Sequence, residues 1–409
     1  MKSYPTILSL CSLALLPNIS FGADESPYLF GDWGGARTEL ADKGVSLNLF
    51  HIFDVYDDFS GAAESGGTYF GRQRVAIDLD LEKLLGWENS YIAISGVHQY
   101  GNNYNRSRFG VFTNPSSIEG TETTRLANIY FGQSLFDGQL NYQIGKVDGV
   151  GAFGSQEYGS SFMNDEFAYV ANAIFGSALP FDPAQKLGLI VEYQPNGTQL
   201  YLKGGVFDSN QLDSYADDHN GLSFDWEGPV AYAAELGYRS DPDKTDKPGF
   251  VKLGFHYNTG NFANFLGTTE DDNNKLIYLS AGRTLHNFDS QQQRRIDGSI
   301  TWVHAPEDRN LYADELIFVL RAIGPFAARP NDELGLGVVA AYISDDYSDA
   351  SQSAGGPVAK EEYTVELSYK AAITPWFQLQ PSLQAVMNPA GDTDRDTVWI
   401  AGLRSVITF

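Results

Sequence analysis

The sequence predicts an all-β protein that forms a sixteen-stranded antiparallel transmembrane β-barrel. Three observations predict it: an alternating strand at the end of the chain, a succession of similar segments, and connections that alternate in length. The last strand, 396–409, carries its larger apolar residues on one face: Trp399, Ala401, Leu403, Ile407 and Phe409. Period-two alternation of this length indicates a strand. A terminal strand leaves an unpaired edge, and a closed barrel is the arrangement that removes it in lipid, although this segment alone also fits a soluble sandwich.

Segments of about ten residues with the same alternation recur along the chain, as expected for a membrane barrel. Turn residues separate them, and their number is even. The sixteen predicted strands are 45–56, 68–81, 89–101, 123–134, 139–148, 185–194, 198–208, 229–240, 249–260, 274–285, 294–304, 312–322, 333–344, 360–372, 376–388 and 396–409.

The connections between these strands alternate between short and long. Short ones include 135–138, 195–197 and 373–375, whereas the long ones are 102–122, 149–184, 209–228, 261–273 and 345–359. A barrel with tight periplasmic turns and longer outer loops produces this alternation, with both chain ends on the periplasmic side. A large soluble periplasmic β-protein gives no reason for such regular sorting.

The N-terminal region predicts export. Residues 1–22 have the layout of a signal peptide, with Lys2 before an apolar run and a small-x-small site at Ser20 to Gly22. Cys11 is the only cysteine, so the exported chain has neither a disulfide framework nor thiolate metal ligands. A lipoprotein cleavage box around Cys11 is the less favoured alternative, because the apolar run continues beyond it.

The exported chain divides into a short segment and the barrel. Residues 23–44 form the predicted periplasmic segment, and 45–409 form the barrel. Within the first segment, 32–43 read as a short amphipathic helix, with Asp32 placed to cap its start and Gly44 to end it.

The charge balance excludes some classes of partner. Acidic residues outnumber basic ones by 52 to 27, and the formal net charge is −25. This surface argues against binding of nucleic acid. The acids gather in predicted outer loops, at 208–225, 270–272, 345–349 and 392–396. There they fit either contacts with outer-membrane lipid and lipopolysaccharide through divalent cations or a solvated loop surface.

Catalytic motifs are missing from the sequence. The six histidines are scattered, without an i, i+4 pair or an HExxH motif, and neither a GxSxG elbow nor a phosphate-binding glycine loop occurs. We therefore expect no catalytic residues, no metal site and no cofactor. An outer-membrane lipase-type enzyme, and an adhesin or lipopolysaccharide-binding scaffold, remain as alternatives from other functional classes.

Several motifs along the chain resemble the carbohydrate-selective porin family, OprB type. The opening Leu29-Phe30-Gly31-Asp32-Trp33-Gly34-Gly35 is similar to the start of that family, and further similar blocks follow in the family's order: 78–83, 86–87, 124–126, 136–138, 144–148, 205–208 and 305–310. The resemblance covers almost all of the exported chain. It implies an outer-membrane porin that lets monosaccharides, glucose above all, diffuse passively. Ala127-Asn128 replaces the tryptophan and glutamate usual there, which leaves the sugar preference open.

Lumen-facing charges are the first candidates for a pore site. Arg72 and Arg74 lie two residues apart on one strand, so their side chains point the same way, with Asp78 on the same face further toward the periplasm. Guanidinium groups offer forked donors to sugar hydroxyls. Glu192 and Lys203 are further lumenal candidates. For each of these charges, a salt bridge that only stiffens the wall is the alternative interpretation.

The loop 149–184 is the second candidate, because loops of this length are usually functional. In porins of this size the third outer loop folds inward and narrows the channel, and we expect the same here. Its candidate residues combine rings that stack on sugars with groups that accept from hydroxyls: Glu157, Phe162, Asp165, Glu166 and Phe167. Aromatic rings that merely pin the loop to the wall are the alternative.

The expected function is passive, with weak binding so that a solute does not block its own route. A general or anion-type porin for phosphate or carboxylates is the alternative transport function, which the acids opposite the arginines and the negative net charge disfavour. Expected partners are a small carbohydrate, outer-membrane lipid and lipopolysaccharide, and the barrel assembly machinery through the C-terminal strand ending at Phe409.

Overall fold

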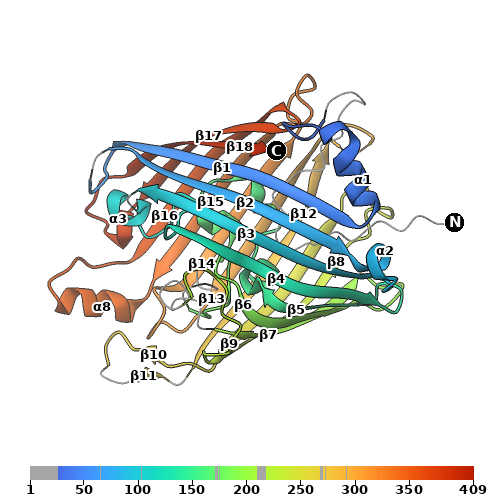
Figure 1. Cartoon of the computed structure of the whole chain (residues 1–409). Helices are drawn as coiled ribbons and strands as arrows, with labels where there is room; N and C mark the ends of the chain where they lie inside the picture. Colours follow the sequence, from blue (N-terminus) through green and yellow to red (C-terminus); the bar gives the residue numbers. More distant parts are fainter. Residues whose placement is uncertain are drawn as a thin grey trace.

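The computed structural model describes residues 26–409 except 65, 103, 171–173, 175, 210–217, 268–269, 272 and 292. The predicted signal peptide with Cys11, and Phe175 of the long loop, lie outside the described residues. Sixteen strands close into one antiparallel barrel, in which each strand pairs with its neighbour and β1 pairs with β18 (Figure 1). The predicted fold class is confirmed.

The barrel strands lie where the alternation placed them, within a few residues at each end. A separate two-stranded sheet, β10 (Phe262–Ala263) and β11 (Glu270–Asp271), lies in an outer loop. The barrel strands are β1 (Val45–Ser60), β2 (Thr68–Asp80), β3 (Ser90–Asn102), β4 (Thr123–Leu135), β5 (Leu140–Val147), β6 (Lys186–Tyr193), β7 (Leu200–Asp208), β8 (Val230–Arg239), β9 (Gly249–Asn258), β12 (Asn274–Asn287), β13 (Arg295–His304), β14 (Tyr312–Ile323), β15 (Glu333–Ile343), β16 (Glu361–Thr374), β17 (Phe377–Met387) and β18 (Val398–Thr408).

The two faces of the wall differ in polarity as the alternation requires. On β16, Glu362 and Glu366 are fully buried in the barrel, whereas Leu367, which directly follows Glu366, is 49 % exposed on the outside. On β17, Gln380 is buried and Leu383 is exposed. Lipid contacts the apolar face, and the polar face meets the lumen and the loops inside it. Within the described residues, no helix is long and apolar enough to cross a membrane.

Two short helices, α2 (Leu81–Leu85) and α8 (Asp345–Ser353), lie outside the lumen. The periplasmic turn after β2 holds α2, and Asp80 caps it by accepting from the backbone N–H groups of Glu82 and Lys83. Asp80 therefore stabilises this turn. In the outer loop between β15 and β16, α8 begins after Ser344, whose hydroxyl accepts from Tyr347 N–H.

The N-terminal helix is shorter than predicted. A 3-10 turn, Trp33–Gly35, precedes α1, which spans Ala36–Asp42. Gly34 and Gly35 have φ angles of +69° and +97°, and this left-handed backbone delays the start of the α-helix. The side chain of Asp32 still accepts from the backbone N–H of Thr38, and Gly44, at φ +95°, follows the helix end as expected.

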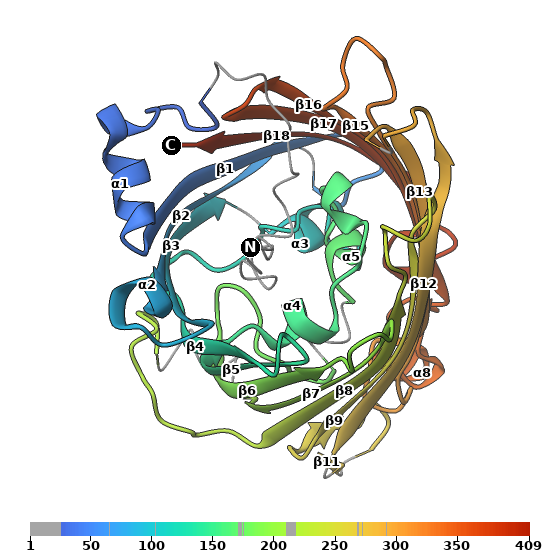
Figure 2. The same cartoon turned by 90° about the vertical axis from the view of Figure 1, so that its right-hand side faces the viewer.

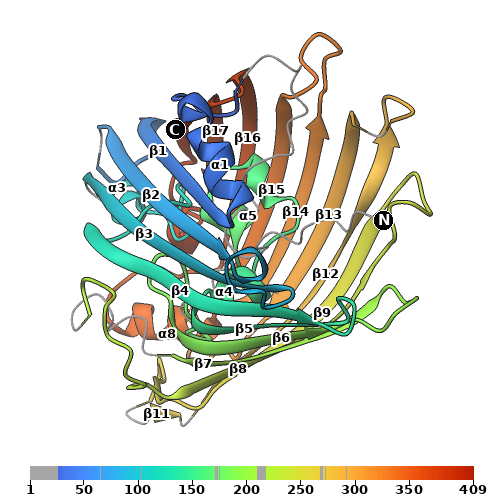
Figure 3. The same cartoon turned by 45° about the vertical axis from the view of Figure 1, so that its right-hand side comes forward.

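The N-terminal segment clamps the seam where the barrel closes. The β1–β18 ladder begins at Phe50 and Thr408, so the first residues of β1 extend past β18. Arg37 donates to the backbone oxygens of Leu47 at 2.6 Å and Phe409 at 2.7 Å. Its guanidinium lies 3.7 Å and 4.2 Å from the ring centres of Tyr28 and Trp33. We call residues 28–37 the seam clamp; it runs into α1, which lies on the outside of the wall, beside the C-terminus (Figures 2 and 3).

Replacing Arg37 by alanine is expected to lower the free energy of unfolding by about 3 kcal/mol, because two hydrogen bonds from a charged donor are lost. Thermal unfolding followed by the heat-dependent shift of the barrel on SDS gels measures this. Lys43→Ala is the matched control, since Lys43 forms an exposed pair with Glu39 at 2.5 Å, a type that contributes little. Equal stability of both variants would show that the clamp does not hold the seam.

Two outer loops enter the barrel. The third outer loop, residues 148–185, carries α4 (Gly149–Phe153), a 3-10 turn (Gly159–Ser161) and α5 (Asp165–Ala168). The second outer loop, residues 104–122, carries α3 (Asn105–Phe109). Seen along the barrel, these helices lie inside the ring of strands (Figure 2). The inward third loop was predicted, whereas the inward second loop was not.

Candidate functional site: the channel constriction

Wall carboxylates hold the two inner loops by their backbones. Glu366 on β16 accepts from the N–H groups of Met163 and Asn164 of the third loop, at 2.8 and 2.9 Å. Closer to the outer end of the same strand, Glu362 accepts from the N–H groups of Phe112 and Thr113 of the second loop, at 2.9 and 2.7 Å. Hydrogen bonds to a carboxylate are stronger than neutral ones, so these two acids fix the course of both loops in the lumen.

Arg72 and Arg74 anchor the returning arm of the third loop. Asp182 lies between them, 3.0 Å from Nη1 of Arg72 and in direct contact with Nη2 of Arg74. The two arginine side chains are only 9 % and 4 % exposed. The pKa of Asp182 is lowered below its usual value because the two guanidinium groups outweigh the effect of burial. The guanidinium forks that were expected to face a solute are therefore engaged with the loop.

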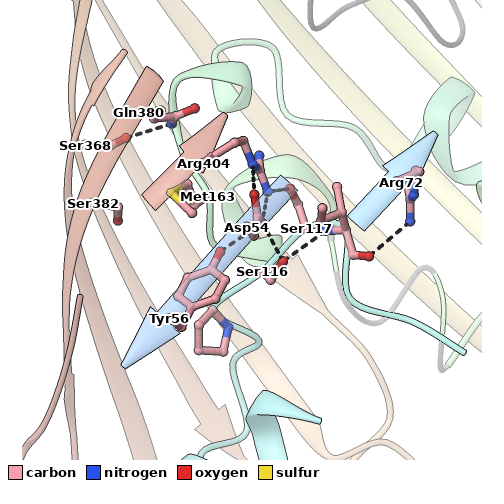
Figure 4. A network of polar contacts seen from close by, with 12 residues as sticks. Asp54, Tyr56, Arg72, Ser116, Ser117, Met163, Ser368, Gln380, Ser382 and Arg404 are labelled. Carbon is pink, nitrogen blue, oxygen red and sulfur yellow. Dashed lines mark hydrogen bonds and ion pairs between the residues drawn. The ribbon is translucent and has the colours of Figure 1, made fainter. Parts of the chain in front are cut away.

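A second ion pair ties the second loop to the seam strands. Arg404 on β18 binds Asp54 on β1 through two hydrogen bonds of 2.7 Å, and both side chains are buried. From the second loop, Ser116 donates to Asp54 and Ser117 accepts from Arg404 (Figure 4). Bidentate geometry fixes both partners in orientation, so this pair makes a rigid side of the passage.

A group of partly exposed charged side chains lies between these anchors. Asp165 on α5 is subject to the charges of Arg106, Arg72 and Arg404, and Arg106 also interacts with Glu119. The side chain of Arg106 is 28 % exposed. Burial raises the pKa of Asp165 to about 6 and that of Glu119 to about 7. We call Arg106, Glu119 and Asp165 the constriction charges, since they lie where the two inner loops meet.

The two predicted loop aromatics face the wall. Phe162 and Phe167 are 1 % and 0 % exposed, and their ring centres are 4.5 Å apart. They fill space left by glycines of β15: a Cβ added at Gly337 would lie 2.4 Å from a ring carbon of Phe167, and one at Gly335 would lie 2.9 Å from Phe162. The structure thus places both rings as packing residues, with almost no surface left for stacking on a sugar.

The remaining predicted site residues are distributed over other parts of the lumen. Glu157 is 45 % exposed and lies 3.8 Å from Lys252. Lys203 binds Glu235 at 3.1 Å and donates to the backbone oxygen of Ala152, so it supports α4.

Two predicted acids lie on the periplasmic half of the wall. Glu192 binds Arg239 at 3.0 Å, and Arg239 also lies 3.9 Å from the ring centre of Tyr201. Asp78 on β2 lies level with Ser46 and Ala93, and one of its oxygens has no hydrogen-bond partner among the described residues. Glu166 is completely buried beside Glu315 of β14. Of the predicted site residues, Arg72 and Arg74 therefore share Asp182, and the charge of Arg72 also acts on Asp165.

Sequence reasoning missed Arg106, Glu119 and Asp182 as members of the site. Arg106 and Glu119 lie in a loop that gave no sign of entering the barrel. Asp182 precedes a proline near the end of the third loop, 108 residues from Arg74. The signal in the sequence that could have identified these three residues is that they are charged side chains in long loops of a predicted barrel. Within the described chain, no group of three or more His, Cys, Asp or Glu side chains is arranged to hold a metal ion.

Comparison with known proteins identifies the family. A model described as carbohydrate-selective porin, OprB family, matches residues 64–409. Porin B of Pseudomonas aeruginosa is 25 % identical over 427 residues, covering 94 % of this chain and 92 % of its own. The putative porin QuiX of Acinetobacter baylyi is 24 % identical over 425 residues, covering 95 % of this chain and 94 % of its own.

Solved structures show the same fold. The high-pH structure of Pseudomonas putida OprB superposes with a TM-score of 0.87 at 23 % identity, covering 94 % of this chain and 99 % of that one. A low-pH structure of the same protein gives a TM-score of 0.57 at 20 % identity. The match of the family model over most of the sequence, together with this barrel, shows that the chain belongs to the OprB family of carbohydrate-selective porins.

Proposed function

We propose that this outer-membrane porin passes monosaccharides such as glucose by diffusion, and that the constriction charges are the groups a sugar meets. The observation that carries the proposal is their arrangement: one guanidinium and two carboxyls, partly exposed, from two loops fixed to the wall. Forked donors and carboxylate acceptors complement the alternating donor and acceptor hydroxyls of a pyranose. The interactions replace part of the sugar's hydration without holding it for long.

The residues predicted from the sequence then divide by role. Asp165 contacts the solute. Arg72 and Arg74 keep the third loop in place through Asp182, and the electrostatic field of the guanidinium groups still reaches the passage. Glu157, Glu192, Lys203 and Asp78 line or support the lumen away from the constriction.

Liposome swelling tests this proposal. Vesicles containing the porin are expected to swell in glucose several times faster than in a disaccharide of equal osmolarity, because the inner loops limit the passage. Glucose added to a single-channel recording should lower the ionic current by occupying the pore. A general or anion-type porin for phosphate or carboxylates would instead pass these anions readily and show no glucose effect. Glu157→Gln serves as a control for the constriction variant Asp165→Asn.

We further propose two contacts with the envelope. The C-terminal strand, ending at Phe409, is the segment that the barrel assembly machinery recognises before closure. The acidic outer loops contact lipopolysaccharide through divalent cations. Assembly of a chain lacking its last residues, and the effect of EDTA on outer-membrane retention, test these two contacts separately.

A further inference from the structure

Two buried carboxyl groups face each other between the third loop and the wall. Glu166 on α5 and Glu315 on β14 are each 0 % exposed. Their side chains are close enough to hydrogen-bond to each other. Within the described residues, none of their four carboxyl oxygens has a hydrogen-bond donor. Two buried carboxylates in contact repel each other strongly unless something lies between them.

The surrounding charges do not neutralise this pair. Nη2 of Arg106 lies 3.9 Å from Oε1 of Glu166, which is too long for a hydrogen bond. The other titratable groups that face the pair or Arg106 come from the second loop, the third loop, β14 and β16, and they are acidic or phenolic: Glu119, Asp165, Tyr312 and Glu362. Burial, and then Glu315, raise the pKa of Glu166 well above its usual value. One guanidinium therefore faces two carboxyl groups and several further acids.

We propose that Glu166 and Glu315 share one proton, and that the pair, carrying a single negative charge, positions Arg106 at the constriction. The proton supplies the donor that both side chains lack, and the remaining charge attracts the guanidinium from the second loop. The pair thus joins three elements: α5, β14 and α3.

Loss of the shared proton has a defined consequence. When the proton passes to water in the lumen, two adjacent negative charges remain, one on α5 and one on β14. Their repulsion opposes the contact of α5 with the wall. Because Glu366 and Asp182 still hold the loop at other points, we expect α5 to shift without release of the whole loop. The width of the passage is therefore expected to change at alkaline pH, where the proton is lost.

Single-channel conductance in potassium chloride tests the shared proton. The scan runs from about pH 8 to about pH 10, above the ordinary range of carboxyl titration. The native protein is expected to change conductance by about twofold across this range. Glu315→Gln and Glu166→Gln replace the shared proton by a permanent N–H donor and retain one negative charge. Both variants should keep the conductance of the native protein at pH 8 throughout.

The double variant Glu166→Gln/Glu315→Gln separates the two parts of the proposal. It keeps a donor but removes the charge, so Arg106 should lose the attraction of the pair and shift, and the cation-to-anion permeability ratio should change several-fold at every pH. If the double variant behaves like the single variants, the pair does not position Arg106. If the alkaline transition persists in both single variants, the pair does not share a proton.

Two controls complete the experiment. Glu157→Gln changes an exposed acid of the same loop and should retain the alkaline transition, and EDTA should leave it unaltered. Loss of the transition in EDTA would replace the proton by a bound cation and overturn the proposal. The inference uses the proposed channel function only for its readout. Potassium chloride currents do not depend on sugar, so a porin that rejects glucose still gives a clear result.

Discussion

Replacing Asp182 by alanine is expected to raise the single-channel conductance several-fold and to destabilise the protein. The variant leaves Arg72 and Arg74 charged and almost fully covered, at 9 % and 4 % exposure, with their shared partner removed. Breaking a buried ion pair in this way costs about 3–5 kcal/mol. The returning arm of the third loop then loses its attachment to β2, so we expect it to move away from the wall and to fluctuate in the lumen. Planar bilayer recordings measure the conductance and its noise.

Two variants define the cause of this effect. Asp182→Asn keeps the size of the side chain and one acceptor oxygen, so its conductance should lie between those of the native protein and the alanine variant. Asp241→Ala removes an exposed periplasmic pair with Lys244, at 2.8 Å, and should leave conductance and stability almost unchanged. A normal conductance of Asp182→Ala, despite reduced stability, would mean that Arg72 and Arg74 do not control the position of the loop.

Lowering the pH from about 8 to about 5 is expected to reduce the cation-to-anion permeability ratio about tenfold. The pKa values of Glu119 and Asp165 are raised to about 7 and about 6, so both carboxyl groups are charged above this range and neutral below it. At low pH the guanidinium of Arg106 remains charged. The sum of the three constriction charges therefore turns from net negative to net positive as the pH falls.

Reversal potentials in a salt gradient measure this change. Glu119→Gln together with Asp165→Asn should abolish most of it and fix the ratio near the low-pH value of the native protein. Glu192→Gln, at the periplasmic half of the lumen, should retain the native dependence on pH. A double variant that still shows the full change would place the responsible groups elsewhere.

The strands were predictable from the sequence because each carries its own information. Alternation with period two, closed by turn residues, is a local property, and β16 and β17 show it with almost no exception. The length of 149–184 indicated a functional loop, and its place as the third outer loop of a porin-like barrel predicted its inward course. The lumenal direction of Arg72 and Arg74 followed from their strand and is confirmed by the buried pair they form with Asp182.

The contacts inside the barrel were not predictable, because they join residues far apart in the chain. Thr113 and Glu362 are 249 residues apart, and Asn164 and Glu366 are 202 residues apart. No periodicity encodes such pairs. The burial of Phe162 and Phe167 depends in the same way on two glycines of β15, which leave room for the rings. A sequence shows that a loop carries aromatic and acidic residues, but the opposite wall decides which of them remain accessible.

The seam clamp has a consequence for the order of assembly. Leu29 donates its N–H to the carbonyl of Thr408, and the ring of Phe30 lies 5.5 Å from that of Phe409. The segment that precedes β1 thus binds the end of β18, the strand that pairs with β1 to close the barrel. Until the final strand arrives, Arg37 has no complete set of acceptors. Arg37 therefore docks fully only when the barrel is closed. An incomplete chain would leave the seam clamp accessible to chaperones or proteases of the periplasm.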